Sequence, residues 1–453
     1  MRRRIHLLLV LSTLTLAGSA AAGNTRSFLF GNEAAVTAGA GPALYTGSDA
    51  LWYNPAGLGG FGRNRLSITG TAFMARYNPL RNLAVSDLSS GPQSSTLMAN
   101  QFLSIPTALV QIFRGNDRMS WGFGIFVPKS TIYHARSSLA SSENIFGMIG
   151  ADYHRGLDIS LQNFQYDIGP ALGWQITPRL RMGFSLMFVY EALKRSTTVF
   201  VRSAGQLDGA SVTAFGYSTS RFDVSYYGLK AVVGLQWELA RGWHAGIVVR
   251  SPTLAFYRWG EKSSSVSQHA LDGDFTSPAE FTFDSHSLEH WGADLVEPLE
   301  ISIALGHSRP GGWIGLEGSI MLPTASKAFQ IRRQMEWNIS LGGRLELTDA
   351  VGVGAGLFTD RSPNTSPSAL GAQDVDFYGA TVGVEWSKTL PLRGKPDSES
   401  LVFSTTLALR TALGIGSVGG LQYNPDDGGV LETPPRDARF LELSLHLGSS
   451  ISY

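Results

Sequence analysis

Apolar residues alternate with small or polar residues in many short stretches of the chain, and this period of two is typical of β-strands with one apolar face. The last stretch shows it most clearly, because Leu441, Leu443, Leu445 and Leu447 alternate with polar or small residues up to the terminal Tyr453. The pattern predicts fourteen strands, near residues 65–76, 102–113, 119–127, 163–176, 180–191, 222–239, 241–250, 297–308, 312–322, 335–347, 349–359, 375–388, 400–413 and 438–453. Each is about as long as a tilted strand that crosses a bilayer, or longer.

The connections between these strands alternate in length. Short turns fall at 114–118, 177–178, 241–242, 309–312 and 348–349. Long loops are expected at 77–101, 128–162, 192–221 and 251–296. Outer-membrane barrels combine short periplasmic turns with long extracellular loops, and an even strand number puts both chain ends in the periplasm. The alternation therefore favours an all-β transmembrane antiparallel barrel over the alternative, a secreted β-sandwich.

Each expected strand has one apolar face and one face that carries charges. In 335–347, Trp337 and Ile339 alternate with Glu336 and Asn338. An Arg or Lys facing lipid near the midplane costs about 2–4 kcal/mol, so we expect the charged face to line the lumen. Aromatic residues near strand ends on the outward register are expected to form interfacial girdles: Trp121, Trp174, Trp237, Trp243, Trp337, Trp386 and Tyr453.

The start of the chain and its composition support export to the outer membrane of a Gram-negative bacterium. Three arginines, an apolar run and a stretch of alanines predict a signal peptide over residues 1–22. Lys+Arg and Asp+Glu both number 36, so no basic face for nucleic acid is indicated. Cysteine is absent, which excludes disulfides and thiolate metal sites. We expect a monomer in contact with outer-membrane lipid.

Residues 23–64 do not fit a strand and precede the first one. They are rich in small residues and include Asn54-Pro55-Ala56-Gly57. Pro55 fixes its own φ and biases Asn54 towards an extended conformation, which makes a rigid turn with small side chains. We expect this segment to form a hatch that plugs the lumen, with residues 65–453 forming the barrel.

Several sequence blocks together resemble a known family. Asn54-Pro55-Ala56-Gly57 is followed, in order, by the blocks 121–128, 250–253 and 356–363. They resemble the FadL/TodX-type outer-membrane transport family for long-chain fatty acids and hydrocarbons. The resemblance implies an N-terminal hatch, uptake of hydrophobic compounds, and lateral release into the bilayer at a kinked third strand. The residues of that strand that would weaken the wall are Gly122, Gly124 and Pro128.

The resemblance further implies that the turn at residues 54–57 acts as a gate for this lateral opening. Asn54, Pro55, Ala56 and Gly57 are expected to lie beside a gap in the wall near the third strand. The alternative is an ordinary structural turn before the first strand. The transported compound also stays open, because long-chain fatty acids and aromatic hydrocarbons both fit the resemblance.

Apolar residues on the inward register are candidates for a hydrophobic ligand path, since burying an alkyl or aromatic ligand gains about 25 cal/mol per Å². These residues are Phe73, Phe126, Met187, Val248, Met321, Phe358 and Phe377. They could instead pack against the hatch. Among the inward charges, Arg250, Arg344 and Arg410 are candidates to contact a ligand carboxylate, because a guanidinium binds it through two hydrogen bonds. The alternative is a structural network of paired lumen charges.

Motifs for catalysis are missing from the sequence. It contains neither G-x-S-x-G nor H-E-x-x-H, and His286 and His290 fit a solvated loop better than a metal site. We expect no enzyme activity, no cofactor and no metal. The C-terminal residues His446, Gly448, Ile451 and Tyr453 resemble the signal read by the outer-membrane insertion machinery. The expected function is diffusion-driven transport of hydrophobic compounds; the alternative is a general porin or a structural or adhesin-like barrel.

Overall fold

The computed structural model of the chain describes residues 24, 26–77, 79–98, 101–145, 148–271, 280–329, 331–364, 367, 370–391, 400–424 and 430–453. The expected signal peptide, residues 1–22, lies outside the described residues. Within them, no helix has the length and apolar character needed to cross a membrane.

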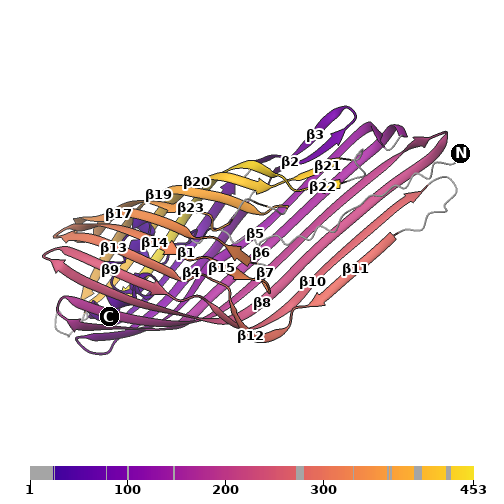
Figure 1. The fold of residues 1–453 in the computed structure, drawn as a ribbon. Helices are drawn as coiled ribbons and strands as arrows, with labels where there is room; N and C mark the ends of the chain where they lie inside the picture. Colours follow the sequence, from indigo (N-terminus) through magenta and orange to yellow (C-terminus); the bar gives the residue numbers. More distant parts are fainter. Residues whose placement is uncertain are drawn as a thin grey trace.

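Fourteen antiparallel strands form a closed barrel (Figure 1). In order around the ring they are β1 (Arg65–Tyr77), β4 (Gln101–Arg114), β5 (Met119–Ile145), β6 (Met148–Thr177), β7 (Leu180–Leu207), β8 (Ala210–Ala240), β9 (Trp243–Arg250), β13 (Glu300–Arg309), β14 (Gly312–Met321), β17 (Glu336–Thr348), β18 (Val351–Asp360), β19 (Gln373–Pro391), β20 (Ser400–Gly419) and β23 (Pro435–Ser452). Each strand pairs with the next, and β23 pairs back with β1. The prediction of a fourteen-stranded barrel is confirmed.

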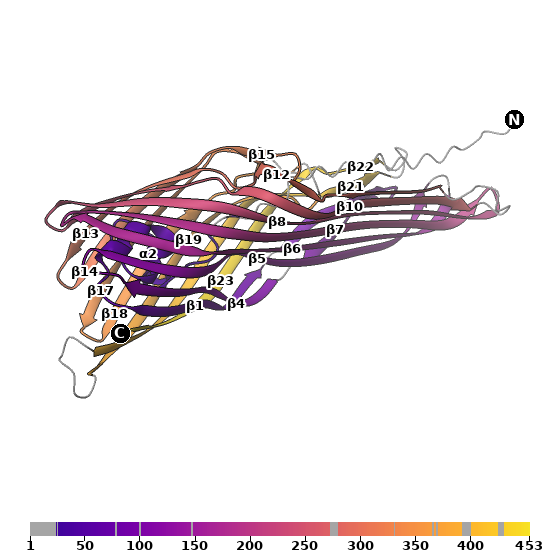
Figure 2. The same cartoon turned by 90° about the horizontal axis from the view of Figure 1, so that it is seen from below.

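Two of the expected loops are strands. The described residues of 128–162, and those of 192–221 apart from the turn at 208–209, belong to β5–β8, which continue far beyond the short strands of the opposite wall (Figures 1 and 2). β10 (Leu254–Leu271), β11 (Glu280–Ser287) and β12 (His290–Leu295) extend the same sheet from β8, inside the range expected as the loop 251–296. The prediction of loops was wrong because strands that leave the bilayer no longer need apolar residues on their outward face.

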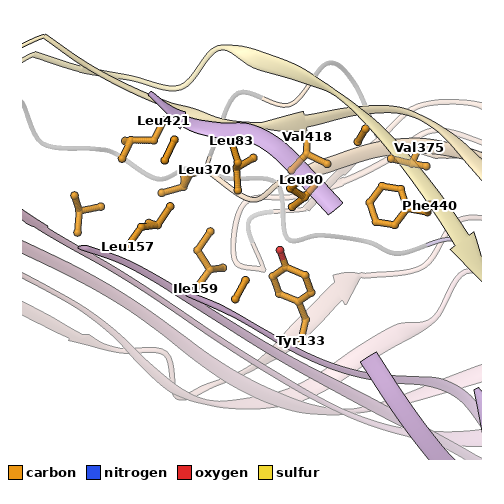
Figure 3. Close-up of a cluster of buried hydrophobic side chains, with 14 of the residues drawn as sticks. Leu80, Leu83, Tyr133, Leu157, Ile159, Leu370, Val375, Val418, Leu421 and Phe440 are labelled. Carbon is orange, nitrogen blue, oxygen red and sulfur yellow. The ribbon is translucent and has the colours of Figure 1, made fainter. Parts of the chain in front are cut away.

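The expected loop 77–101 also contains strands. β2 (Pro79–Leu88) and β3 (Gly91–Met98) form a separate four-stranded sheet with β21 (Leu421–Asn424) and β22 (Val430–Glu432). This sheet shares a hydrophobic core with the extended part of β5–β7. Figure 3 shows part of this core, in which Leu80, Leu83 and Leu421 lie opposite Tyr133, Leu157 and Ile159. A short hairpin, β15 (Thr324–Ser326) and β16 (Ile331–Arg333), follows β14.

The outer surface of the barrel is apolar where strand alternation predicts it. Trp337 and Ile339 are 46% and 44% exposed, whereas Glu336 and Asn338, on the opposite face of β17, are buried. The other six expected girdle aromatics are exposed as well: Trp121, Trp174, Trp237, Trp243, Trp386 and Tyr453.

The sequence reading missed a second aromatic row, on the outward register of five neighbouring strands. Tyr166, Tyr190, Tyr227, Tyr257 and Trp291 follow one another across β6, β7, β8, β10 and β12. Ring centroids of successive members are 4.3–6.4 Å apart. Aromatic rings gather at membrane interfaces, so this row is consistent with the outer edge of the apolar band.

The N-terminal segment fills the barrel interior. Its elements are α1 (Asn32–Thr37), α2 (Ser48–Tyr53) and the 3-10 helix η1 (Pro55–Gly60). α1 contacts β17–β20 and β23, whereas η1 contacts β5–β8, so the segment bridges opposite walls (Figure 2). The buried carboxylate of Asp49 in α2 accepts a hydrogen bond from the backbone N–H of Ala34 (2.9 Å), which joins the two helices and supplies an acceptor to a free donor of α1.

Candidate functional site

An internal cavity of about 110 Å³ lies between the N-terminal segment and the barrel wall. Phe28, Phe30 and Trp52 of the N-terminal segment form part of its lining. The rings of Phe30 and Trp52 have centroids 4.5 Å apart, and both contact Phe126 of β5. The cavity therefore offers aromatic surface to a ligand, supplied mainly by the segment that fills the barrel.

The seven residues predicted to line a ligand path fall in different places. Val248, Met321 and Phe358 line the cavity. Phe126 and Met187 are buried in the hydrophobic cluster between wall and N-terminal segment. Phe377 belongs instead to the outer core with Phe440, and Phe73 lies at an irregularity between β1 and β23, outside the cavity lining. Their role in ligand passage stays a prediction.

The three arginines proposed to contact a carboxylate all have acidic partners within the chain. Arg250 pairs with Glu300 and lies over the ring of Trp52 (5.1 Å to the centroid). Arg410 pairs with buried Glu442. Both line the cavity.

Arg344 is 2.9 Å from Glu385 and lies outside the cavity lining. These pairs match the structural-network alternative. Whether any of the three arginines also touches a ligand stays a prediction.

A chain of ion pairs connects β5 to other parts of the wall. The Lys129 ammonium is 3.1 Å from Glu191 in β7 and 2.9 Å from Glu297, which lies between β12 and β13. Glu297 also pairs with Lys230 of β8 (3.1 Å), which in turn pairs with buried Asp167. Lys129, Lys230 and Glu297 line the cavity. Sequence analysis did not single out Lys129, which falls in the range expected as the loop 128–162, or Glu297, which is the first residue of the expected strand 297–308.

Arg333 is a cavity-lining cation that differs from the others. Its side chain is only 5% exposed, and it lies in the short strand β16. Among the described residues it has no ion-pair partner within 4 Å, and its Nε is buried without a hydrogen-bond partner. Sequence reasoning missed this residue, because a three-residue strand has no periodicity from which to assign a face.

The start of the described N-terminal segment is fastened inside the lumen. The guanidinium of Arg26 donates to both carboxylate oxygens of Glu317 in β14 (2.8 and 2.9 Å). Its backbone N–H donates to a carboxylate oxygen of Asp360 at the end of β18 (3.2 Å). Arg26 and Glu317 line the cavity, so the N-terminal segment supplies polar as well as aromatic lining.

The Asn54-Pro55-Ala56 turn lies against β7 and β8. The Asn54 side-chain amide donates to the carbonyl of Leu235 in β8 (3.0 Å), and its oxygen accepts from the N–H of Ala56 (3.2 Å). A Cβ on Gly183 of β7 would come within 2.1 Å of the Pro55 carbonyl carbon. The turn therefore packs most closely on the inward glycines of β7 and β8, and η1, which begins at Pro55, also contacts the third strand, β5. Its role as a gate stays a prediction.

The third strand is irregular at the expected position. Its inward glycines, Gly122 and Gly124, face Leu51 of α2. Pairing between β4 and β5 ends at Ala108 and Phe126, and the register with β6 shifts between Phe126 and Lys129. Pro128, inside this break, lines the cavity. The cavity thus extends to the part of the wall where β5 is paired least.

The C-terminal residues have well-defined surroundings. His446 is buried, with ring nitrogens 3.2 Å from the Ser444 hydroxyl and 3.4 Å from that of Thr71. Gly448 and Ile451 lie in β23, whereas Tyr453 is half exposed at the end of the barrel where β1 begins. The assembly role of these residues stays a prediction.

The described part of the chain contains no group of three or more His, Asp or Glu side chains arranged to hold a metal ion. His286, singled out with His290 in the sequence, is exposed and 3.1 Å from Asp284, in an exposed strand.

Comparisons with known proteins agree with this architecture. The family model described as outer membrane protein transport protein (OMPP1/FadL/TodX) matches residues 9–295, more than half of the chain. A FadL homologue from Pseudomonas aeruginosa superposes with a TM-score of 0.59 at 13% identity, and the alignment covers 95% of this chain and 99% of the other. The monoaromatic hydrocarbon channel CymD (TM-score 0.54) and the Pseudomonas putida toluene transporter TodX (TM-score 0.52) align with the same identity and coverage. A search of curated protein sequences found no match.

Proposed function

Because the chain belongs to the OMPP1/FadL/TodX family of outer-membrane transport proteins, we propose that it takes up hydrophobic compounds that carry a carboxylate, such as long-chain fatty acids. The observation that carries this proposal is Arg333, a buried guanidinium on the cavity wall with no acidic partner within 4 Å among the described residues. A buried cation is costly without a partner, and a ligand carboxylate would supply one. The aromatic lining from Phe28, Phe30 and Trp52 would bind the adjoining carbon chain.

Transport requires the N-terminal segment to move. A cavity of about 110 Å³ is smaller than the roughly 150 Å³ cavity that holds one benzene molecule. We therefore propose that the structure represents a closed state, and that residues 23–64 act as a hatch whose displacement enlarges the cavity.

We further propose that the compound leaves sideways between β4 and β5. Their pairing ends at Ala108 and Phe126, and Pro128 connects this break with the cavity. The test uses the natural absence of cysteine. A cross-linker between cysteines placed at Pro106 and Pro128 should abolish uptake by cells while leaving ligand binding to the purified protein unchanged. Full uptake after complete cross-linking would exclude this route.

A second candidate substrate class is neutral aromatic hydrocarbons. The aromatic lining favours it, and two of the structurally similar proteins are a toluene transporter and a monoaromatic hydrocarbon channel. A general porin is disfavoured, because the N-terminal segment fills the lumen.

Binding measurements separate the two substrate classes. Purified protein is titrated with a long-chain fatty acid, with the alcohol of equal chain length and with toluene. A hydrogen bond to a charged group contributes about 1.5–3 kcal/mol, so the acid should bind about 10–100 times more tightly than the alcohol. Arg333→Met should remove this difference.

The matched control is Arg332→Met. Arg332 is the preceding residue of β16 and is exposed, so its replacement should preserve the preference for the acid. Equal binding of acid and alcohol by the parent protein, together with tight binding of toluene, would establish the hydrocarbon alternative instead.

A further inference from the structure

Strand β1 is irregular along both of its edges within one short stretch. Its register with β23 shifts between Thr71 and Phe73. Its register with β4 shifts between Thr69 and Gly70 and again between Thr71 and Met74. Bulges leave residues unpaired and bend the strand. The barrel wall is therefore locally weakened at residues 69–74, on the side of β4 away from β5.

A groove of about 410 Å³ opens on the wall at this stretch. Its lining includes Ile68 and Ala72 of β1, Ile105 and Pro106 of β4, and Leu447 of β23. Ile68 and Leu447 are about half exposed, like the lipid-facing leucines of the rest of the barrel, so the groove opens outward. The described residues that line it include no charged side chain.

The groove lies within the apolar band of the barrel. β1 begins at Arg65, at the end of the barrel where Tyr453 pairs with Asn64. With a rise of about 3.3 Å per residue and a tilt of about 40°, Ile68 to Ala72 lie roughly 8–18 Å above that start. The outward apolar band of such barrels is about 25 Å tall, so the groove faces the middle of the bilayer.

Behind the groove the wall is only one backbone thick. Gly70 and Gly448 line both this groove and, on the lumen side, a crevice too narrow for a water molecule, which Leu29 and Asn32 also line. A Cβ on Gly448 would come within 2.2 Å of the Asn32 side-chain oxygen. This oxygen is buried and has no hydrogen-bond partner. The N-terminal segment thus lies directly against the inner side of the wall behind the groove.

We propose that the groove binds an acyl chain of a lipid of the surrounding membrane and that this chain covers the bulged part of β1. The bilayer is the medium into which the groove opens, so hydrocarbon chains are the species present around it at high concentration. Its volume is nearly three times the roughly 150 Å³ that holds one benzene, which is room for a segment of chain. Because the lining has no charge, the site recognises the chain and not the headgroup.

Photo-crosslinking tests the proposal. The protein is reconstituted in phosphatidylcholine vesicles that contain a small fraction of the same lipid with a photoreactive group in the middle of one acyl chain. Peptide mapping should show at least a several-fold enrichment of adducts at 68–72, 104–106 and 447–449 over the equally exposed outward positions Ile303 and Ile314. Exchange of the photoreactive lipid for its phosphatidylglycerol counterpart should leave the enrichment unchanged.

A filled groove provides the specificity test. Thr405 of β20 lines the groove, whereas Thr411 is an exposed residue of the same strand outside it. Thr405→Phe should reduce the number of groove adducts to that found on the rest of the outward face, and Thr411→Phe should leave the groove adducts unchanged.

Two results would overturn the proposal. One is an even distribution of adducts over the outward face of the parent protein. The other is labelling of the groove by a free photoreactive fatty acid but not by the phospholipid, which would identify an exit site for a transported compound. The proposal does not depend on which compound the barrel transports.

Discussion

A methyl group placed on Gly183 should separate the N-terminal segment from the barrel wall. Gly183 lies in β7, and a Cβ there would come within 2.1 Å of the Pro55 carbonyl carbon and 2.3 Å of the Ala56 nitrogen. Ordinary contacts begin near 3.4 Å, so the two backbones must move apart by about 1.3 Å (3.4 minus 2.1). Both atoms belong to the backbone, which means that no side-chain rotation can relieve the overlap.

The expected magnitude follows from two effects. Overpacking of a well-packed site costs about 1–3 kcal/mol. A shift of this size also breaks the hydrogen bond from Asn54 to the carbonyl of Leu235, with a net loss of about 1 kcal/mol. Together these effects, about 2–4 kcal/mol, raise the ratio of displaced to docked segment roughly 30- to 1,000-fold.

Hydrogen exchange of the backbone amides at residues 54–58 measures this ratio, and ion conductance in planar bilayers reports whether the lumen opens. The amides should exchange faster in Gly183→Ala, and conductance should rise, while the barrel keeps its heat-modifiable migration. Gly318→Ala is the matched control, because Gly318 also lies in a barrel strand and its new methyl group would meet nothing within 4 Å. Exchange rates equal to those of the control would refute the reasoning that β7 holds the turn.

Three further predictions concern other parts of the molecule. Hydrogen bonds from Ser141 and from the β2–β3 turn lower the pKa of Glu143 to about 2. The attachment of the turn to this carboxylate is therefore complete above about pH 4.5 and is lost as the pH falls towards 2. Glu143→Gln should speed hydrogen exchange in the turn at pH 7. Deletion of Tyr453 should reduce the amount of folded barrel in outer membranes without changing synthesis, measured by heat-modifiable migration. Lys129→Met should increase exchange at residues 126–132, because it leaves the buried carboxylate of Glu191 without its cation, whereas Lys194→Met, at an exposed pair, should have no effect.

The membrane-embedded part of the fold was predictable from the sequence because the bilayer imposes a strict rule. Every outward side chain in the apolar band faces hydrocarbon, so strands such as β17 show an alternation that is interrupted only at Gly343. The rule ends where the strands leave the bilayer. In β8, polar residues such as Thr219 and Arg221 occupy the outward register. Because polar residues then stand on both faces of the strand, the sequence pattern there is the same as that of a loop.

The same limit explains which site residues could be predicted. Alternation identifies the inward residues correctly, as Val248 and Phe358 show. It does not tell which inward residues meet the cavity, because the cavity boundary depends on where the N-terminal segment docks. Inward glycines such as Gly183 and Gly234 determine that docking by admitting the backbone of the segment. A glycine has no side chain to indicate its partner, so the sequence could not show which wall the turn contacts.

The pairing of the lumen charges is the strongest argument about the ligand. Arg250 and Arg410 appeared equivalent to any other inward arginine in the sequence, yet each has an acidic partner that offsets the cost of burial. Arg333 is also buried, and no carboxylate lies within 4 Å of it among the described residues. In a site that binds only neutral hydrocarbons, the cation interacts only with the more distant carboxylates of Glu297 and Glu336, and no direct ion pair offsets its desolvation cost. A site that binds a carboxylate recovers that cost when the ligand arrives, and this difference is why we place the headgroup of the proposed substrate at Arg333.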